Sequence, residues 1–551
     1  MRTIPERESL SVEFKSDVKR LPDADLVATV VCLANTEGGA IYLGVEDDGR
    51  LTGLHAEHQN VSGMSAMIAN RTNPPLSVRI SVLVEEGVTI ARIEVPRSTR
   101  LVATSDGLLQ RRRLQADGTP QCVPFYPHEF ASRYSDLGTL DYAALPVAES
   151  SETDLDPLER ERLRQMIERS SGDHSLIGLS DSELDGALGL VRSEQGRRIP
   201  TVAGLLILGR EAALHTYLPT HEVAFQVLEG TQVRVNDFYR TPLLKTFERI
   251  LEQFTARVTE EEVQMGLFRV PIPTLDRRAF REAFVNALVH RDYTRRGAVH
   301  VRWESDGFSI SNPGGFVEGV TLANLLVVEP KPRNPSLADA MKRIGLAERT
   351  GRGVDLIYEG LLRFGRPAPD YTRSDTTTVV VSLSSTEADL PFLHMILEQE
   401  KRTQRRIALD ALIVLAHLRT QRRIDLAEAA HVIQKNEFVT RGVIERLVEA
   451  GIIEAHGATK NRSYTLSPRV YRELGQSADY VRQAGFEPIQ QAQMVIQYVK
   501  KHGRITRKDV VDLCHVTEDQ ATYLLRKLHA AGEIKRVGRG RGVYYEQAMI
   551  A

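Results

Sequence analysis

REAFVNALVHRDY, residues 281–293, is the stretch that decides the fold of the central part of this chain, together with SNPGG at 311–315 and RTGRGVD at 349–355. In a helix over the first stretch, Glu282 and Asn286 lie one turn apart on the same face. A carboxylate and an amide so placed can hold a water molecule and a magnesium ion. Glycines allow backbone amides to approach a phosphate chain, here at Gly314, Gly315, Gly351 and Gly353. The pattern predicts a nucleotide pocket without a Walker loop.

The order of the predicted elements supports this pocket more strongly than any single motif does. A helix with Glu and Asn four residues apart is common, and each glycine cluster could by itself be a turn or a helix end. Here two predicted strands, 300–303 and 308–310, follow the helix, and a second helix begins at Gly353. The sequence therefore favours a nucleotide site over isolated turns.

Glu282 and Asn286 resemble the N-box of the GHKL ATPases, the group that contains gyrase and the histidine kinases. In that group the glutamate orients the attacking water and the asparagine carries magnesium, so the resemblance implies ATP and Mg²⁺ as cofactors. NPGG resembles the first glycine box and TGRGVD the second. Where the group has an aspartate for the adenine amino group, this chain has Asn312, whose uncharged oxygen makes a weaker hydrogen bond. The resemblance implies catalysis by Glu282 and nucleotide binding by Asn286, Asn312, Gly314, Gly315, Gly351 and Gly353.

The N-terminal region carries a second resemblance. ESLSVEFK at 8–15 and ANTEGGAIYLGVEDDGRLTGL at 34–54 resemble the Schlafen AlbA-type domain. In its nuclease members, two glutamates five residues apart and a later aspartate hold a divalent metal, Mg²⁺ or Mn²⁺, for RNA cleavage. The matching residues are Glu8, Glu13 and Asp47, and Lys15 can neutralise a scissile phosphate. Acidic residues around an edge strand are also frequent on soluble surfaces, so the motif favours the domain more than it favours cleavage.

The C-terminal part contains an internal repeat. LVEAGIIEAHGATKNRSYTL at 447–466 and LHAAGEIKRVGRGRGVYY at 528–545 each read as a helix, a glycine and a hairpin with a basic turn, preceded by two helices. This is the pattern of two tandem winged helix-turn-helix domains. Such domains also serve protein contacts, and Glu518 and Asp519 at the start of the second recognition helix would repel a DNA groove. The basic wing residues that we expect to contact phosphates are Lys535, Arg536, Arg539, Arg541, Lys460 and Arg462.

Composition sets limits on the class of protein. The chain has 551 residues with 71 basic and 73 acidic side chains, so its net charge of −2 gives no global argument for nucleic-acid binding. Cys32, Cys122 and Cys514 are too few and too scattered for a disulfide framework or a cysteine-based zinc site, which indicates a reducing compartment. No apolar run approaches the roughly 18 residues of a membrane helix. We expect a cytoplasmic protein that does not bind membranes.

The fold class is expected to be mixed α/β and multidomain. The predicted order is a Schlafen AlbA-like α+β domain at 1–136, a linker and helical segment at 137–179, a GHKL-like α/β sandwich at 180–385, and winged helices at 386–475 and 476–551. Finer patterns predict a hairpin turn at Glu86 and Gly87, a strand at 203–209 and a long amphipathic helix at 241–258.

Together the three resemblances are those of a bacterial family of predicted ATP-binding, helix-turn-helix transcriptional regulators. We expect a regulator that binds ATP and nucleic acid, with DNA favoured over RNA, and in which the nucleotide state controls the disposition of the winged helices. We also expect a homo-oligomer. One alternative is a Schlafen-type metal-dependent endonuclease that acts on RNA or single-stranded DNA, in phage defence, with ATP as its gate. A further alternative is a nucleotide-binding scaffold for protein partners.

Overall fold

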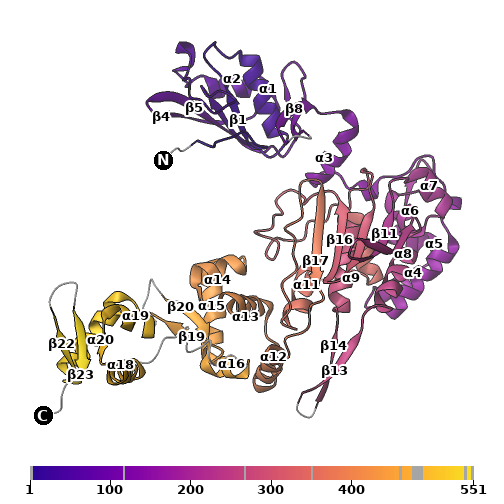
Figure 1. The fold of residues 1–551 in the computed structure, drawn as a ribbon. Coiled ribbons are helices and arrows are strands. Elements are labelled where there is room, and N and C mark those ends of the chain that lie inside the picture. Colours follow the sequence, from indigo (N-terminus) through magenta and orange to yellow (C-terminus); the bar gives the residue numbers. More distant parts are fainter. Residues whose placement is uncertain are drawn as a thin grey trace.

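The computed structural model describes residues 4–115, 118–265, 268–348, 351–457, 462–474, 488–514, 516–538 and 543–547. An N-terminal domain is followed by a central region and by two smaller helical units, here called the first and second C-terminal units (Figure 1). Helices and several separate sheets alternate along the chain. The expected mixed α/β, multidomain class is confirmed.

The N-terminal domain is built on a four-stranded sheet in the order β1-β2-β5-β4. The parallel pair β1 (Val12–Lys15) and β2 (Gly39–Leu43) is joined by helix α1 (Asp23–Ala34), whose apolar face is buried against the sheet. Strands β4 (Arg79–Glu85) and β5 (Val88–Val95) form the predicted hairpin, with positive φ at both turn residues. The smaller elements are η1 (Ala56–His58), α2 (Met64–Asn70), β3 (Thr72–Asn73), β6 (Ala103–Thr104), β7 (Gln110–Leu114), β8 (Pro120–Pro124), η2 (Pro127–Glu129) and α3 (Phe130–Asp136).

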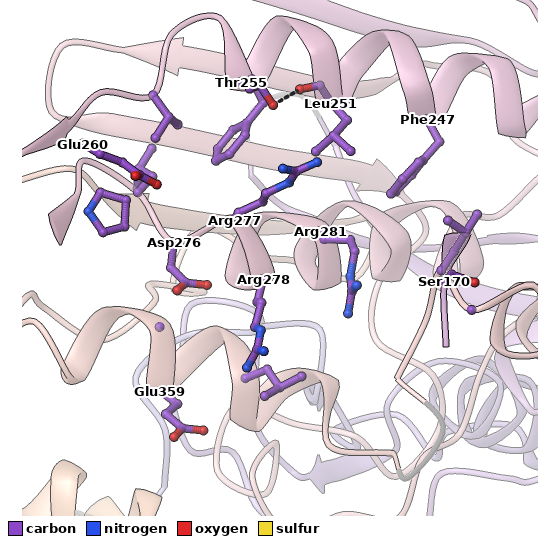
Figure 2. Close-up of a pocket in the computed structure, with 18 of the residues that line it drawn as sticks. Ser170, Phe247, Leu251, Thr255, Glu260, Asp276, Arg277, Arg278, Arg281 and Glu359 are labelled. Atoms are coloured by element: carbon purple, nitrogen blue, oxygen red, sulfur yellow. Dashed lines mark hydrogen bonds between the residues drawn. The ribbon is translucent and has the colours of Figure 1, made fainter. Parts of the chain in front are cut away.

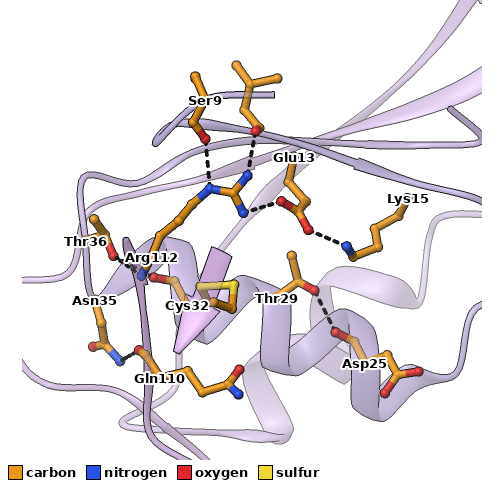
Figure 3. The surroundings of a disulfide bond; sticks show 12 residues. Ser9, Glu13, Lys15, Asp25, Thr29, Cys32, Asn35, Thr36, Gln110 and Arg112 are labelled. Atoms are coloured by element: carbon orange, nitrogen blue, oxygen red, sulfur yellow. Dashed lines mark hydrogen bonds and ion pairs between the residues drawn. A yellow bond between two sulfur atoms is a disulfide. The ribbon is translucent and has the colours of Figure 1, made fainter. Parts of the chain in front are cut away.

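A disulfide joins Cys32 on α1 to Cys122 on β8 (Figure 3). The β7–β8 hairpin lies across the end of α1, where the Asn35 side chain donates to the carbonyl oxygen of Gln110 at 2.9 Å. Because the two cysteines are 90 residues apart, their spacing gives no sign of this pairing. A single disulfide is not a framework, but it shows that the cysteine count no longer supports the expected reducing compartment. Cys514 is buried and free.

The central region is organised around a five-stranded sheet in the order β12-β11-β15-β16-β17. Its strands are β11 (Val223–Glu229), β12 (Gln232–Tyr239), β15 (Val299–Glu304), β16 (Gly307–Pro313) and β17 (Thr378–Ser384). Strands β11 and β15 are parallel, and the other neighbours are antiparallel. The helices are α4 (Pro157–Arg169), α5 (Asp181–Ala187), α6 (Val202–Leu208), α7 (Glu211–Tyr217), α8 (Leu243–Thr255), α9 (Arg277–His290), α10 (Pro335–Ile344) and α11 (Gly353–Leu362). Smaller elements are η3 (Tyr142–Ala144), η4 (Glu152–Asp154), η5 (His174–Leu176), β9 (Val191–Glu194) and β10 (Arg197–Pro200).

Helix α9 forms where the sequence predicts it, for identifiable local reasons. The Asp276 side chain caps its start by accepting a hydrogen bond from the backbone N–H of Ala279 at 2.8 Å. Phe280 and Phe284, one turn apart, are buried in the core of the region, and the Phe280 ring stacks on that of Phe254 from α8 at a centroid distance of 4.0 Å. The polar face of α9 is thereby turned away from the sheet core.

One expectation for this region differs from the structure. Residues 203–209 do not form a strand, because Val202–Leu208 is helix α6, capped by the Thr201 hydroxyl, which accepts from the N–H of Gly204 at 3.0 Å. Within residues 137–179, expected to be a linker and helical segment, α4 places Leu163 and Ile167 in the same core as the central sheet.

A β-hairpin leaves the central region between α8 and α9. Its strands, β13 (Glu260–Met265) and β14 (Phe268–Pro273), pair only with each other and extend away from the body of the region (Figure 1).

The two C-terminal units repeat one order of elements, as the sequence repeat predicts. Each has a helix, a short strand, two helices and a two-stranded hairpin whose second strand also pairs with the short strand. The first unit contains α12 (Leu390–Thr403), α13 (Leu409–Gln421), β18 (Ile424–Asp425), α14 (Leu426–Val432), α15 (Glu437–Glu449), β19 (Ile453–His456), β20 (Ser463–Leu466) and α16 (Pro468–Glu473). The second contains α18 (Pro488–His502), β21 (Arg504–Ile505), α19 (Arg507–Cys514), α20 (Glu518–Ala530), β22 (Ile534–Val537) and β23 (Tyr544–Gln547). In the part of the chain that is described, no helix is both long and apolar enough to cross a bilayer.

Candidate nucleotide site

The predicted catalytic carboxylate lies in a protected position on α9. Glu282 is 1% exposed, and its Oε1 accepts a hydrogen bond from Nη2 of the neighbouring Arg281 at 3.0 Å. Its Oε2 accepts from the backbone N–H of Glu348 at 3.4 Å. Burial raises the pKa of the Glu282 carboxyl, while Arg281 acts in the opposite direction. A carboxylate with a raised pKa is a better proton acceptor near neutral pH.

The first residue of α11 lies directly above Glu282 and Asn286. A Cβ atom added to Gly353 would be 3.1 Å from Glu282 Oε2, and 3.6 and 3.7 Å from Asn286 Nδ2 and Oδ1. Glycine is therefore the residue that leaves room beside this pair. Gly353 also begins a helix, whose first backbone N–H groups have no partner within the helix and favour an anion. The structure thus brings together two motifs that lie about seventy residues apart in the sequence.

A cavity of about 280 Å³ surrounds this junction. The predicted residues that line it are Glu282, Asn286, Asn312, Gly315, Gly351 and Gly353. Asn312 is 4% exposed near the end of β16. Gly314 is not among the lining residues: an added Cβ there would meet Asp292 at 3.0 Å and the Arg333 guanidinium at 3.2 Å instead. Its φ of +98° lets the chain turn closely around Arg333.

Two lysines that the sequence analysis did not select also line the cavity. Lys342 on α10 is half-buried, and Lys331 precedes that helix. Neither lysine is engaged in an ion pair within the described residues. Polyphosphate needs cations of this kind. Nothing in KPRN or in AMKRIG distinguishes these side chains from ordinary surface lysines, so only the fold identifies them.

One buried arginine connects the cavity to the N-terminal domain. Arg333, 1% exposed, donates from Nε to the carbonyl oxygen of His290 at 3.0 Å and from Nη2 to that of Gly315 at 2.8 Å. Its Nη1 forms an ion pair with Asp136 at the end of α3. From the same helix, the Ser132 hydroxyl donates to the buried carboxylate of Asp292 at 2.5 Å. The glycine loop is therefore held in place from outside the central region.

The segment that closes the cavity, residues 316–332, is here called the lid segment. It contributes apolar lining residues, and both neighbouring parts of the molecule contact it. From the first C-terminal unit, Gln434 accepts from the N–H of Leu326 and donates to the carbonyl oxygen of Leu322, both at 2.8 Å. From the N-terminal domain, Arg97 forms an ion pair with Glu318 at 2.8 Å. The lid segment is therefore bonded to both neighbours.

The N-terminal carboxylates are arranged differently from the prediction. Glu13 is 7% exposed and forms ion pairs with Lys15 and with Arg112, which is itself 2% exposed (Figure 3). Glu8 accepts a hydrogen bond from the backbone N–H of Phe14 at 2.9 Å, whereas Asp47 is exposed beyond the end of β2. No group of three His, Cys, Asp or Glu side chains that could hold a metal occurs among the described residues.

Among the described residues, Glu8, Glu13 and Asp47 therefore do not form the expected three-carboxylate group. The reason is that Arg112, brought in by β7, and Lys15 already neutralise Glu13. Lys15 is accordingly not left free for a scissile phosphate. Arg112 is about a hundred residues away in the sequence, which explains why the motif alone could not show it.

The predicted phosphate-contacting residues are only partly described. Lys535 and Arg536 are exposed on β22, and Arg462 is exposed with its guanidinium 5.7 Å from the ring centre of Tyr464. Lys460, Arg539 and Arg541 lie outside the described residues. Glu518, which appeared unfavourable for a DNA contact, forms an ion pair with Arg507 at 2.9 Å.

Three family models match separate parts of the chain. Residues 8–116 match the family model "Schlafen, AlbA_2", and residues 297–383 match the model "Putative ATP-dependent DNA helicase recG C-terminal". The chain contains a Schlafen AlbA_2 domain and a RecG-like C-terminal ATPase domain. Residues 133–224 match a domain of unknown function, DUF8451. The RecG-like match includes the glycine motifs and Asn312 but begins after Glu282 and Asn286, so the roles of those two residues rest on the geometry described above.

A solved structure has a similar fold over most of the chain. The DIP2311 protein from Corynebacterium diphtheriae is 23% identical, with a TM-score of 0.52, and the match covers 86% of this chain and 95% of that one. At this identity the likeness concerns the fold alone. None of the curated proteins matches the chain.

Proposed function

We propose that the protein binds ATP and Mg²⁺ in the central cavity and binds nucleic acid, with DNA favoured, through two C-terminal winged helices. It acts as a regulator of transcription, in which the nucleotide state sets the position of these winged helices. The observation that supports nucleotide binding most directly is the close approach of Gly353 to Glu282 and Asn286. The matched Schlafen and ATPase-like domains support a protein that binds both ATP and nucleic acid.

Each cavity residue has a chemical role in this proposal. When bound, Mg²⁺ supplies the positive charge that neutralises the phosphates. The Asn286 amide oxygen holds the ion, and the Asn312 oxygen accepts from the adenine amino group. Backbone N–H groups beginning at Gly353 face the phosphate chain, as they do at other helix starts. Glu282 accepts a proton from the water molecule whose oxygen attacks the γ-phosphate, while the bond from that phosphate to ADP breaks and inorganic phosphate forms.

The lid segment supports the proposed coupling to the C-terminal units. Pockets for small ligands usually measure about 300–1,000 Å³, so a cavity of about 280 Å³ is small for a whole nucleotide. ATP entry then requires the lid segment to move outward. That movement breaks both hydrogen bonds from Gln434, each of which contributes about 0.5–1.5 kcal/mol. Nucleotide binding and release of the lid segment from the first C-terminal unit therefore become one equilibrium.

The assignment of winged helices rests on the repeated order of elements and on the exposed faces of their last helices. On α20, Tyr523 is 70% exposed, and Arg526 and Lys527 are exposed beside it. Lys535 and Arg536 on β22 provide further positive charge in the same unit. Cations on a helix and an adjoining hairpin can contact the phosphates on either side of a groove. A homo-oligomer remains part of the proposal.

Metal-dependent cleavage is not favoured, because Glu13 is neutralised by two cations. The scaffold alternative predicts nucleotide binding without any affinity for nucleic acid.

The nucleotide assignment is tested by replacing Asn286 with Ala and measuring the affinity for a fluorescent ATP analogue with and without Mg²⁺. We expect the magnesium-dependent part of binding to disappear while the fold is retained. Asn236→Ala, on the exposed strand β12 outside the cavity, is the matched control. Equal magnesium dependence in the two variants would overturn the assignment.

A further inference from the structure

A second, larger cavity of about 1,210 Å³ shares its walls with the nucleotide site (Figure 2). The first turns of α9 and the later turns of α11 line it, whereas the remaining parts of the same two helices line the nucleotide cavity. Further walls come from α8, the end of α4 and the base of the β13–β14 hairpin, and Arg406 reaches it from the first C-terminal unit. We call this cavity the arginine cleft.

The charge in the arginine cleft is predominantly positive. Arg277, Arg278 and Arg169 are exposed, and their side chains make no ion pair or hydrogen bond within the described residues. Figure 2 shows Arg277 extending toward the helix that carries Leu251, and Arg278 toward the helix that carries Glu359. Their guanidinium groups therefore cover opposite sides of one opening.

Acidic groups in the cleft offset this charge only in part. Glu248 is already paired with Arg162, and Asp276 accepts the cap hydrogen bond of α9. Glu260 and Glu359 remain as carboxylates of the wall. The surplus of guanidinium groups, each with a rigid fork of N–H donors, suits the oxygens of phosphate.

We propose that the arginine cleft binds the phosphodiester backbone of a single nucleic-acid strand. This site goes beyond the proposed duplex contacts of the winged helices. A basic groove that follows the backbone is the usual way in which proteins bind single strands. A duplex, with its phosphates on the outside of a wide cylinder, would meet only the rim of this cleft.

Arg281 links the arginine cleft to the nucleotide site. It lines the cleft, donates to Glu282 at 3.0 Å, and has a buried Nε with no hydrogen-bond partner. A phosphate bound by Arg281 competes with Glu282 for the same N–H donor. Since Arg281 lowers the pKa of Glu282, loss of this contact raises it further and makes the carboxylate a stronger base. Strand binding should therefore accelerate ATP turnover, a step that rests on the proposed function of Glu282.

The test compares two charge reversals in the full chain without nucleotide, using fluorescence anisotropy of a labelled 20-nucleotide oligothymidine and of a labelled duplex. Arg277→Glu/Arg278→Glu should weaken single-strand binding on the order of tenfold and lower its salt slope by roughly 0.7 per lost contact. The duplex affinity of this variant should be unchanged. Lys535→Glu/Arg536→Glu should show the opposite selectivity, with loss of duplex binding.

Arg192→Glu/Arg197→Glu is the matched control, because it makes the same charge change on the exposed β9–β10 hairpin, outside the arginine cleft. An unchanged far-UV circular dichroism spectrum and an unchanged urea midpoint show that each variant is folded. Single-strand affinity that is equal in the cleft variant and in this control would overturn the site, and an equal loss of duplex binding would overturn its preference for single strands. If the strand binds in the cleft but leaves ATP turnover unchanged, the site stands and its link to Glu282 is wrong. Failure of ATP binding alone does not affect the strand measurements, so the two proposals fail separately.

Discussion

Two buried glutamates, one in the central region and one in the N-terminal domain, occupy the positions at which their sequence motifs predict catalysis. Glu282 lies beside a cavity with a single arginine neighbour that is itself about one-third exposed. Glu13 lies between Lys15 and the fully enclosed Arg112. Burial is common to both. What separates a carboxylate available for chemistry from a structural one is whether its counter-ions are already in place.

The largest expected effect follows from removing the base in the central region. Glu282→Gln should reduce ATP turnover by about 10²- to 10⁴-fold while ATP binding is retained, because the amide cannot accept the proton. In the parent, the rate should decline on the acid side of a pKa above the ordinary value of glutamate, since burial raises it. The rate is measured against pH by phosphate release. Glu252→Gln changes an exposed residue of α8 and is the control. If Glu282→Gln leaves the rate of ATP turnover unchanged, Glu282 is a structural carboxylate like Glu13.

The next effect concerns the N-terminal pair. Arg112→Ala leaves Glu13 buried without its enclosed partner, which should cost about 3–5 kcal/mol in the free energy of unfolding of this domain. This loss of unfolding free energy is measured by urea denaturation, monitored through hydrogen exchange of the amides in β1 and β7. Arg113→Ala changes an exposed neighbour on the same strand and should have little effect. If Arg112→Ala instead proved as stable as Arg113→Ala, the burial of Glu13 would not require its ion pair with Arg112.

A smaller effect tests how closely the cavity fits its ligand. Gly353→Ala places a methyl group about 3 Å from Glu282 Oε2, and overpacking of this kind costs about 1–3 kcal/mol. We expect affinity for the Mg²⁺–ATP analogue to decrease about tenfold, which corresponds to ~1.4 kcal/mol. Titration of the analogue checks this. Gly442→Ala, where an added Cβ meets only Arg446 at 3.6 Å, should bind as the parent does. Equal affinity in both variants would mean that ligand does not approach this glycine.

The smallest effect concerns the lid segment. Gln434 has a φ of +57°, which Asn tolerates better than most residues, but the shorter side chain of Gln434→Asn does not reach both lid groups. Loss of about 1 kcal/mol of contact should speed association of the ATP analogue roughly fivefold. Stopped-flow fluorescence measures the rate, with Gln421→Asn, exposed at the end of α13, as control. An unchanged association rate would show that the first C-terminal unit does not restrain the lid segment.

The sequence predicted those parts of the fold and site that depend on local pattern. Helix α9, with its polar pair, and helix α11, with its initial glycine, both lie where the motifs place them. Residues 203–209 were assigned wrongly because a short apolar run between glycines has no periodicity that distinguishes a buried helix from a buried strand. Arg333 and the Cys32–Cys122 bond depend on partners far away in the sequence, and no local pattern records such partners.

The ion pair between Arg333 and Asp136 also limits how this protein can be divided. A fragment that begins at residue 137, after the Schlafen-like domain, keeps Arg333 enclosed among backbone carbonyls but removes the carboxylate with which it forms an ion pair. It also removes Ser132, which donates to Asp292. A buried charge deprived of its partner is strongly destabilising. A stable fragment that contains the ATPase-like region must therefore include helix α3, Phe130–Asp136, and must begin before Phe130.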